Sequence, residues 1–178
     1  MKKYLFDTNF FLDSDLRYYN HTFFAEFWNL MQYLSKKDSF RSIRKVKKEL
    51  MAKEDWVSKF IKNLPQKFFI DETKYMESYI EVIKHSQNLS VNNLAKEKFA
   101  DENKADAWLV AVALKNKYTI ISNEKFIDNK ERKHIKIPRI CKELKIECMD
   151  IFNFIAENKF EFSVKKPKIL QEVLFDTD

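Results

Sequence analysis

Glycine is absent from the 178-residue chain, although average usage of about 7% would predict about twelve. This absence excludes the glycine-rich phosphate loop, the dinucleotide-binding turn and the nucleophile elbow, because each needs glycine at fixed positions. Any phosphate that the protein binds must therefore be held by side chains, metal ions or helix N-termini.

Cysteine and histidine are also scarce: Cys141 and Cys148 are the only two cysteines, and the chain has three histidines. Without a C-x-x-C pair, we expect two reduced thiols and neither a zinc site nor a disulfide. No apolar run approaches the ~20 residues of a membrane span, and Asp7 interrupts the N-terminal apolar stretch too early for a signal peptide. These features predict a soluble, cytoplasmic protein with no membrane partner.

The residues that are present have the composition of a globular domain, with 45% hydrophobic and 34% charged residues. The length predicts one domain over residues 1–160, followed by an extension or tail over residues 161–178. Lysine and arginine (33) exceed aspartate and glutamate (27), giving a net charge of +6. This modest excess favours a polyanionic partner such as nucleic acid, although many lysine-rich proteins bind none.

Helical and β-type apolar patterns alternate along the second half of the chain, which predicts an α/β fold with a central parallel sheet flanked by helices. We expect strands over residues 4–6, 67–70, 118–121, 135–137 and 146–148. We expect helices over residues 22–34, 43–53 (preceded by Ser42), 55–65, 73–87, 105–115, from 138 onward and 150–159, with another short helix between 86 and 104. Asn116 is expected to take the positive φ that ends the helix before it, because asparagine tolerates that conformation next best after glycine.

Two acids follow expected strands at their carboxyl ends, where open parallel sheets bind ligands. Asp7 closes the first strand, and Glu124 lies just beyond the strand at residues 118–121. Each also has a purely structural interpretation, as a loop or capping acid for Asp7 and as an exposed turn residue for Glu124.

Two further acids lie on expected helices. Glu49 falls at the border of the apolar face of its helix, where it could point into a cleft or pair with Lys45 or Lys53 on the surface. Asp106 opens a helix that is apolar nearly all the way round, so it is a capping acid that interacts with Asn103, a metal ligand at the buried helix end, or both at once.

Carboxylates with no histidine ligands suit hard cations, so Mg²⁺ or Mn²⁺ is the expected cofactor. Such ions activate water and stabilise the charge on a phosphodiester during hydrolysis. The densest basic stretches, residues 41–48 and 130–136, are expected to flank the acids and contact phosphates. The candidate RNA-binding residues are Arg41, Arg44, Lys45, Lys48, Arg132 and Lys133.

Four segments in order resemble the motifs of PIN-domain nucleases. They are YLFDTNFFLD, SIRKVKKEL, ADAWLVAVAL and TIISNEKF, which place the four family acids on Asp7, Glu49, Asp106 and Glu124. The segments RYYN, EFW and KIPRICKELKIECMDIF are similar to a poorly characterised bacterial PIN-like branch. The resemblance covers about residues 1–156.

The resemblance implies a three-layer α/β fold and a Mg²⁺- or Mn²⁺-dependent endoribonuclease that hydrolyses single-stranded RNA, with Asn9 and Ser122 supporting the acids. Members are often toxins restrained by an antitoxin protein; whether this chain has such a partner, or forms a homodimer, stays open. The last motif carries Glu124 and Ser122 where the family usually has aspartate and threonine. Two alternatives follow: a catalytically inactive PIN-like module that binds RNA or protein, and a scaffold that docks another protein through its aromatic N-terminal helix.

Overall fold

The computed structural model describes residues 2–125 and 132–163, and its centre is a five-stranded parallel sheet of order β3-β2-β1-β4-β5. The expectation of an α/β fold with a central parallel sheet is confirmed. The strands are β1 (Tyr4–Phe6), β2 (Phe40–Ile43), β3 (Phe69–Ile70), β4 (Thr119–Ile121) and β5 (Cys148–Met149).

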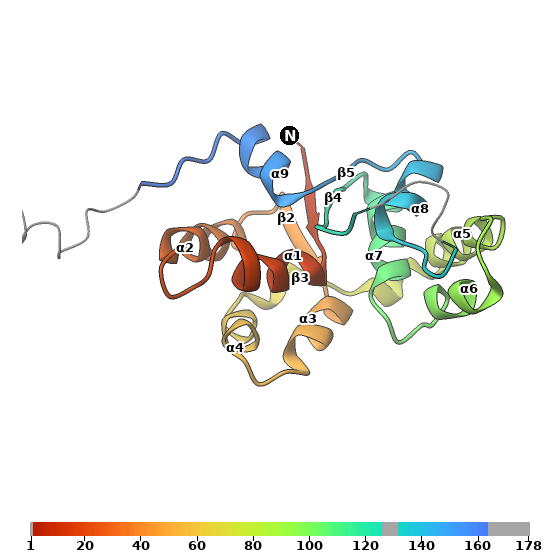
Figure 1. Ribbon diagram of the computed structural model, residues 1–178, viewed down its shortest axis with the longest axis horizontal. Helices are drawn as coiled ribbons and strands as arrows, with labels where there is room; N and C mark the ends of the chain where they lie inside the picture. The colour runs from red at the N-terminus through yellow and green to blue at the C-terminus, as the bar shows by residue number, and fades with distance from the viewer. Residues whose placement is uncertain (1, 126–131, 164–178) are drawn as a thin grey trace, which may run out of the picture.

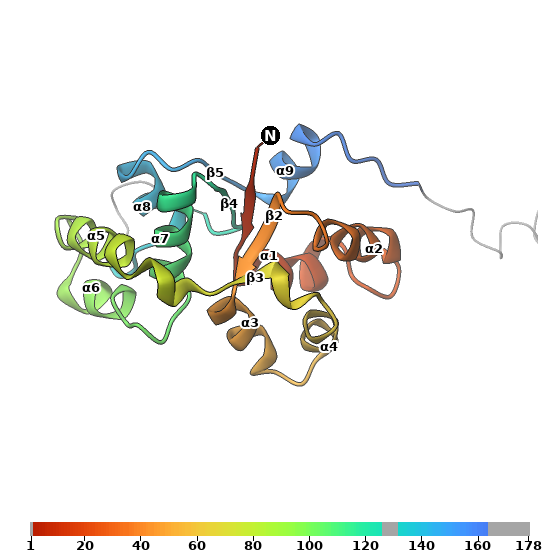
Figure 2. The same cartoon turned by 180° about the vertical axis from the view of Figure 1, so that it is seen from behind.

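Helices cover both faces of the sheet, so the fold has three layers (Figure 1). On one side lie α1 (Thr8–Asp13), α2 (Ala25–Leu34), α4 (Trp56–Lys62) and α9 (Ile151–Glu157). On the other side lie α5 (Met76–Gln87), α6 (Asn93–Phe99), α7 (Asp106–Asn116) and α8 (Ile137–Glu143), as the reverse view in Figure 2 also shows. Helix α3 (Arg44–Met51) follows the carboxyl end of β2. Short helical turns are η1 (Ser14–Tyr18), η2 (Gln66–Phe68) and η3 (Glu72–Tyr75).

Aromatic side chains fill the space between the sheet and the α1–α9 layer. The Phe6 ring lies 4.7 Å from that of Phe10 and 5.4 Å from that of Phe154, all three fully buried. On the opposite face, α7 is buried around most of its circumference, as its apolar composition predicts. These contacts fix the strand ends, and therefore the residues that follow them, in a rigid frame.

The strand order reverses direction between β1 and β4. From β1 the chain builds outward through β2 and β3, then crosses back to place β4 on the other side of β1. At such a switch point the connections leave the two carboxyl ends in opposite directions and open a crevice for ligands. Asp7 and Glu124 follow these two strands, so both lie at that edge of the sheet.

The structure corrects the expected start of the helix at residue 43. Residues 40–43 form β2, and the helix begins at Arg44. The Ser42 hydroxyl is fully buried and donates to the Phe6 carbonyl of β1 at 2.8 Å, so it pairs two strands and does not precede a helix.

Two other local predictions are wrong. Residues 135–137 form no strand, because Ile137 already opens α8 with a proline in its first turn. Lys117, with φ 57°, takes the left-handed position after α7. Asn116 remains helical, and its Nδ2 donates to the Val112 carbonyl at 2.9 Å. Other expected elements are found with shifted bounds; the helix expected over 22–34, for example, begins at Ala25.

Cys141 and Cys148 are free thiols, as expected. No helix in the described residues is long and apolar enough to cross a membrane. The expected tail falls largely on residues 164–178, outside the described part of the chain.

Candidate functional site

Asp7 lies between the end of β1 and the start of α1, with 1% of its surface exposed. Its Oδ1 accepts from the backbone N–H of Thr8 at 2.6 Å, and its Oδ2 accepts from the Ser122 hydroxyl at 2.8 Å. Ser122 follows β4, so this bond joins the two central strands at their carboxyl ends. Burial raises the pKa of Asp7 well above its usual value, and the carboxylates of Asp106 and Glu124 raise it further.

Ser122 therefore supports an acid as the resemblance implied, whereas no hydrogen bond links the Asn9 side chain to any of the four acids within the described residues.

Glu49 reaches from α3 to two other segments. Its Oε1 accepts from the backbone N–H of Ala105 at 2.9 Å, and its Oε2 accepts from the Thr8 hydroxyl at 2.5 Å. Neither Lys45 nor Lys53 forms an ion pair with it in the described structure. The carboxylate thus points inward, toward the N-terminus of α7, and the surface-pair alternative is wrong.

Asp106 occupies the first turn of α7 and is the least supported of the four acids. Asn103 does not interact with it as a cap, because the Asn103 side chain donates to Asp101 at 3.2 Å. Within the described residues no hydrogen bond reaches the Asp106 carboxylate. Burial first, then the charges of Glu124 and Glu49, raise its pKa to about 7 against the opposing effect of Lys104 and Lys136.

Glu124 is held by two donors from the segment that opens α8. Its Oε1 accepts from the Lys136 ammonium at 3.0 Å, and its Oε2 accepts from the backbone N–H of Ile137 at 2.8 Å. Only 10% of the Glu124 side chain is exposed. It is therefore a largely buried, partnered acid, and the exposed-turn alternative is wrong.

The fold brings together acids that are separated by up to 117 positions in the sequence. Asp106 interacts electrostatically with Asp7, Glu49 and Glu124, and Asp7 also interacts with Glu124. In the described part of the chain no three acidic, histidine or cysteine side chains are already spaced to hold a metal ion. The donor chemistry nevertheless fits a hard cation, because carboxylate oxygens are the ligands that Mg²⁺ and Mn²⁺ prefer.

The basic residues expected beside the acids are spread over several surfaces. Arg41 lies in β2, and its guanidinium donates to the Lys37 and Phe40 carbonyls and to Asp38. These acceptors lie at the amino end of the strand, away from the acid-bearing edge. Arg44 pairs with Asp71 at 2.9 Å. The Lys45 ammonium lies 5.7 Å from the Trp108 ring centroid.

The remaining basic candidates are exposed, and they are Lys48, Arg132 and Lys133. Arg132 lines a separate pocket with Arg139 and Glu143, so it does not share the acids' surroundings. Residues 130 and 131 of the second basic stretch lie outside the described residues.

Three lysines lie closer to the acids: Lys136, which belongs to the basic stretch expected there, and Lys98 and Lys104, which were not predicted from the sequence. A pocket of about 210 Å³ contains Asp106 and Glu124 together with Lys98, Lys104 and Lys136. Lys98 comes from α6 and Lys104 from the connection to α7, so only the tertiary fold brings them to the acids. No pattern in the sequence distinguishes these two lysines from the others.

Asn123 was also missed, although it lies inside the SNEKF motif. Its Oδ1 accepts from the backbone N–H of Ile151 at 3.1 Å, which connects the end of β4 to the start of α9. Its Nδ2 is buried and has no hydrogen-bond partner among the residues that the structure describes.

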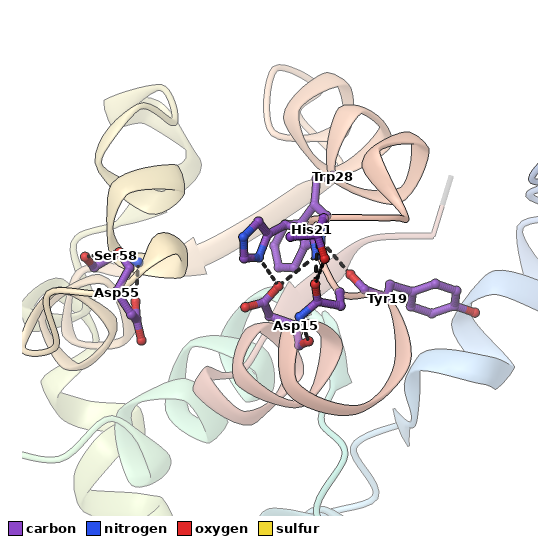
Figure 3. Close-up of polar contacts among 8 residues, drawn as sticks. Asp15, Tyr19, His21, Trp28, Asp55 and Ser58 are labelled. Carbon is purple, nitrogen blue, oxygen red and sulfur yellow. Dashed lines mark hydrogen bonds and ion pairs between the residues drawn. The ribbon is translucent and has the colours of Figure 1, made fainter. Parts of the chain in front are cut away.

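A second polar cluster lies apart from the acids, between η1, α2 and α4 (Figure 3). Asp15 Oδ1 accepts from the backbone N–H of His21 at 3.0 Å and contacts His21 Nδ1 at 2.7 Å. The His21 ring stacks on Trp56, and Trp28 Nε1 donates to the Tyr19 carbonyl at 2.7 Å. The RYYN and EFW segments thus fix the connection between η1 and α2.

Comparison with known proteins finds one family. A family model described as a domain of unknown function (DUF4411) matches residues 4–162. Neither the curated proteins nor the solved structures contain a match.

Proposed function

We propose that this chain, which belongs to the DUF4411 family, is a PIN-like, Mg²⁺- or Mn²⁺-dependent endoribonuclease that hydrolyses single-stranded RNA. The observation that carries the proposal is the convergence of Asp7, Glu49, Asp106 and Glu124 at the switch point of the sheet, where their charges act on one another. Burial and the neighbouring acids raise the pKa of Asp7 and of Asp106, and perturbed carboxyl groups of this kind are typical of functional sites.

The cation would be held by Asp106, which has no protein donor in the described structure, and by Asp7, with Glu49 and Glu124 close enough to add negative charge. When bound, it supplies a Lewis acid that activates water and offsets charge on the phosphodiester. No side-chain nucleophile is required for this chemistry.

The chain's own residues orient the acids and neutralise part of their charge. Ser122 and Thr8 hold the two oxygens of Asp7 in place through hydrogen bonds. Partners of this kind fix the direction of carboxylate lone pairs and so tune a metal site. Lys136 pairs with Glu124 and supplies a positive charge beside the acids, which would otherwise repel a polyanion.

A cleavage assay with matched variants tests the proposal. EDTA-treated protein is mixed with a labelled single-stranded RNA, with and without Mn²⁺, and products are resolved on a gel. We expect Mn²⁺-dependent cleavage that Asp106→Asn abolishes and that Glu81→Gln, on the exposed surface of α5, leaves intact. Cleavage by Asp106→Asn at the wild-type rate would contradict the proposal.

The toxin role that the resemblance suggests is a separate proposal. If the chain is the toxin of a toxin–antitoxin pair, its expression should arrest growth of a bacterial host, and Asp106→Asn should relieve that arrest. Equal arrest by both proteins would contradict a toxin role based on cleavage.

One observation favours a second candidate, an inactive PIN-like module that binds RNA. Both Glu124 oxygens already accept from Lys136 and Ile137, which competes with coordination of a cation. RNA binding without cleavage, and without Mn²⁺ uptake in isothermal titration calorimetry, would select this alternative.

A further inference from the structure

The pocket beside Asp106 and Glu124 has an acidic part and a basic part. Lys98 comes from α6, Lys104 precedes α7, and His134 and Lys136 precede α8; these residues surround the two acids. Lys104 and Lys136 act electrostatically on Asp106, so the basic groups are close to the acid. A ligand in this pocket therefore contacts positive side chains next to the proposed hydrolytic site.

Two of the lysines have charges that the described structure does not neutralise. Lys136 pairs with Glu124. By contrast, neither Lys98 nor Lys104 forms an ion pair within the described residues, and both side chains are exposed at the pocket. Free ammonium groups around a small polar pocket provide donors for an anion of phosphate size.

The pocket favours a phosphate over a nucleobase. Bases bound by proteins commonly stack on exposed aromatic rings or arginine planes. Among the described residues of the lining, the only phenyl, phenol or indole ring is that of Phe99, which is only 4% exposed, and the one exposed ring is the His134 imidazole, which can also donate to an anion. The accessible groups are ammonium and imidazole donors, which match phosphate oxygens.

We propose that this pocket is a phosphate subsite in which Lys98 and Lys104 hold a backbone phosphate of single-stranded RNA adjacent to the phosphodiester that is cleaved. The inference rests on the proposed function and adds to it the place where the strand is held. Lys98 and Lys104 are positioning residues: they orient the strand so that its next phosphodiester lies beside Asp106.

RNA binding tests the subsite without relying on cleavage. Fluorescence anisotropy measures the Kd of a labelled oligoribonucleotide at several salt concentrations in Ca²⁺, and a gel verifies that the RNA stays intact. For Lys98→Gln/Lys104→Gln we expect Kd to rise about tenfold at low salt. The slope of log K against log salt should fall by about 0.7, the value for one phosphate contact on a single strand.

A second double variant controls for the loss of two charges. Lys36→Gln/Lys115→Gln removes the same charge from exposed lysines that precede β2 and β4, at the opposite edge of the sheet. We expect it to change Kd less than twofold and to leave the slope unchanged, because distant surface charges are largely screened by salt. Equal losses of RNA affinity in the two double variants would overturn the subsite.

Oligonucleotide ends identify the source of the phosphate. If the pocket takes a backbone phosphate, the subsite variant should bind 5′-hydroxyl and 5′-phosphate oligonucleotides more weakly than the wild type, by the same factor for both. A loss confined to the 5′-phosphorylated RNA would assign the pocket to a terminal phosphate and overturn the backbone assignment.

The outcomes separate this inference from the proposed function. Cleavage by the wild type, together with wild-type affinity in the subsite variant, overturns the subsite and leaves the nuclease. Weakened binding in the subsite variant, together with no cleavage by the wild type in Mn²⁺, supports the subsite and overturns the nuclease. A wild type that binds no RNA at low salt overturns both.

Discussion

Glu49 Oε1 accepts a 2.9 Å hydrogen bond from the backbone N–H of Ala105, so an acid on α3 caps the N-terminus of α7. The first N–H groups of a helix have no partner within the helix, and a negative charge there is also favourable for the helix dipole. Through its other oxygen Glu49 contacts Thr8, the residue after Asp7. One carboxylate therefore holds the segments that carry Asp7 and Asp106 in a fixed relation.

This double contact predicts different effects for two substitutions of Glu49. Glu49→Ala leaves the Ala105 N–H and the Thr8 hydroxyl without their partner, which should lower the free energy of unfolding by about 1–3 kcal/mol. Glu49→Gln keeps an acceptor for Ala105 and should cost less than about 1 kcal/mol. Urea unfolding of the metal-free proteins measures both values. Equal costs for the two variants would show that the cap contributes nothing measurable.

The sequence was sufficient to predict the parts of the fold that depend on local pattern. The apolar run before Asp7 and the all-round apolar helix after Asp106 specify a buried strand and a buried helix, and both are found. Strand β2 was missed because its buried polar residue, Ser42, is stable only through the carbonyl of Phe6 on a neighbouring strand. A partner 36 positions away leaves no trace in local periodicity.

The candidate site, like the fold, could be predicted only in part from the sequence. The types and order of the four acids could be read from the chain, but the donors that hold them could not. Ile137 binds Glu124 through a backbone N–H, which any residue other than proline provides, so no residue type marks it. Arg41 was assigned to the RNA surface from charge density alone, whereas its guanidinium donates to carbonyls at the amino end of β2.

The raised pKa of Asp106 predicts how the stability of the metal-free protein depends on pH. The folded state holds this proton up to about pH 7, whereas the unfolded chain loses it near 3.8. Between these values the folded state binds more protons, so stability falls as pH rises and levels off above about 7. Asp7, whose pKa is also raised, acts in the same direction.

Thermal melts in EDTA between pH 5 and pH 8 check this sign. We expect the Tm of the wild type to fall by several degrees over this range, and Asp106→Asn to fall less because its side chain does not titrate. Parallel curves for the two proteins would contradict a raised pKa at Asp106.

Lys136 should stabilise the metal-free protein by offsetting the charge of Glu124, to which its ammonium lies at 3.0 Å. Because about a third of the Lys136 side chain is exposed, Lys136→Met should cost only about 1 kcal/mol at pH 8. The uncompensated acids should then gain more from Mn²⁺, so the rise in Tm on adding Mn²⁺ should be larger in the variant than in the wild type. Lys142→Met, on the exposed side of α8, the helix that Lys136 precedes, is the matched control and should change neither value. An unchanged Mn²⁺ response in Lys136→Met would contradict this role.

Asp7→Asn tests whether the central acid is chemical or structural. The new amide can still accept from the Thr8 N–H, and the Ser122 hydroxyl can accept from its NH₂, so the cap and the link between β1 and β4 are kept. Asp106 and Glu124 repel a charge on Asp7, so removing that charge should leave the metal-free protein as stable as the wild type or more stable. Cleavage should be lost, and the rise in Tm on adding Mn²⁺ should be smaller than in the wild type. Melts with and without Mn²⁺, run beside the RNA cleavage assay, measure all three quantities. Were Asp7 only a cap for α1, this variant would cleave RNA at the wild-type rate and respond equally to Mn²⁺, and the proposed nuclease mechanism would be wrong.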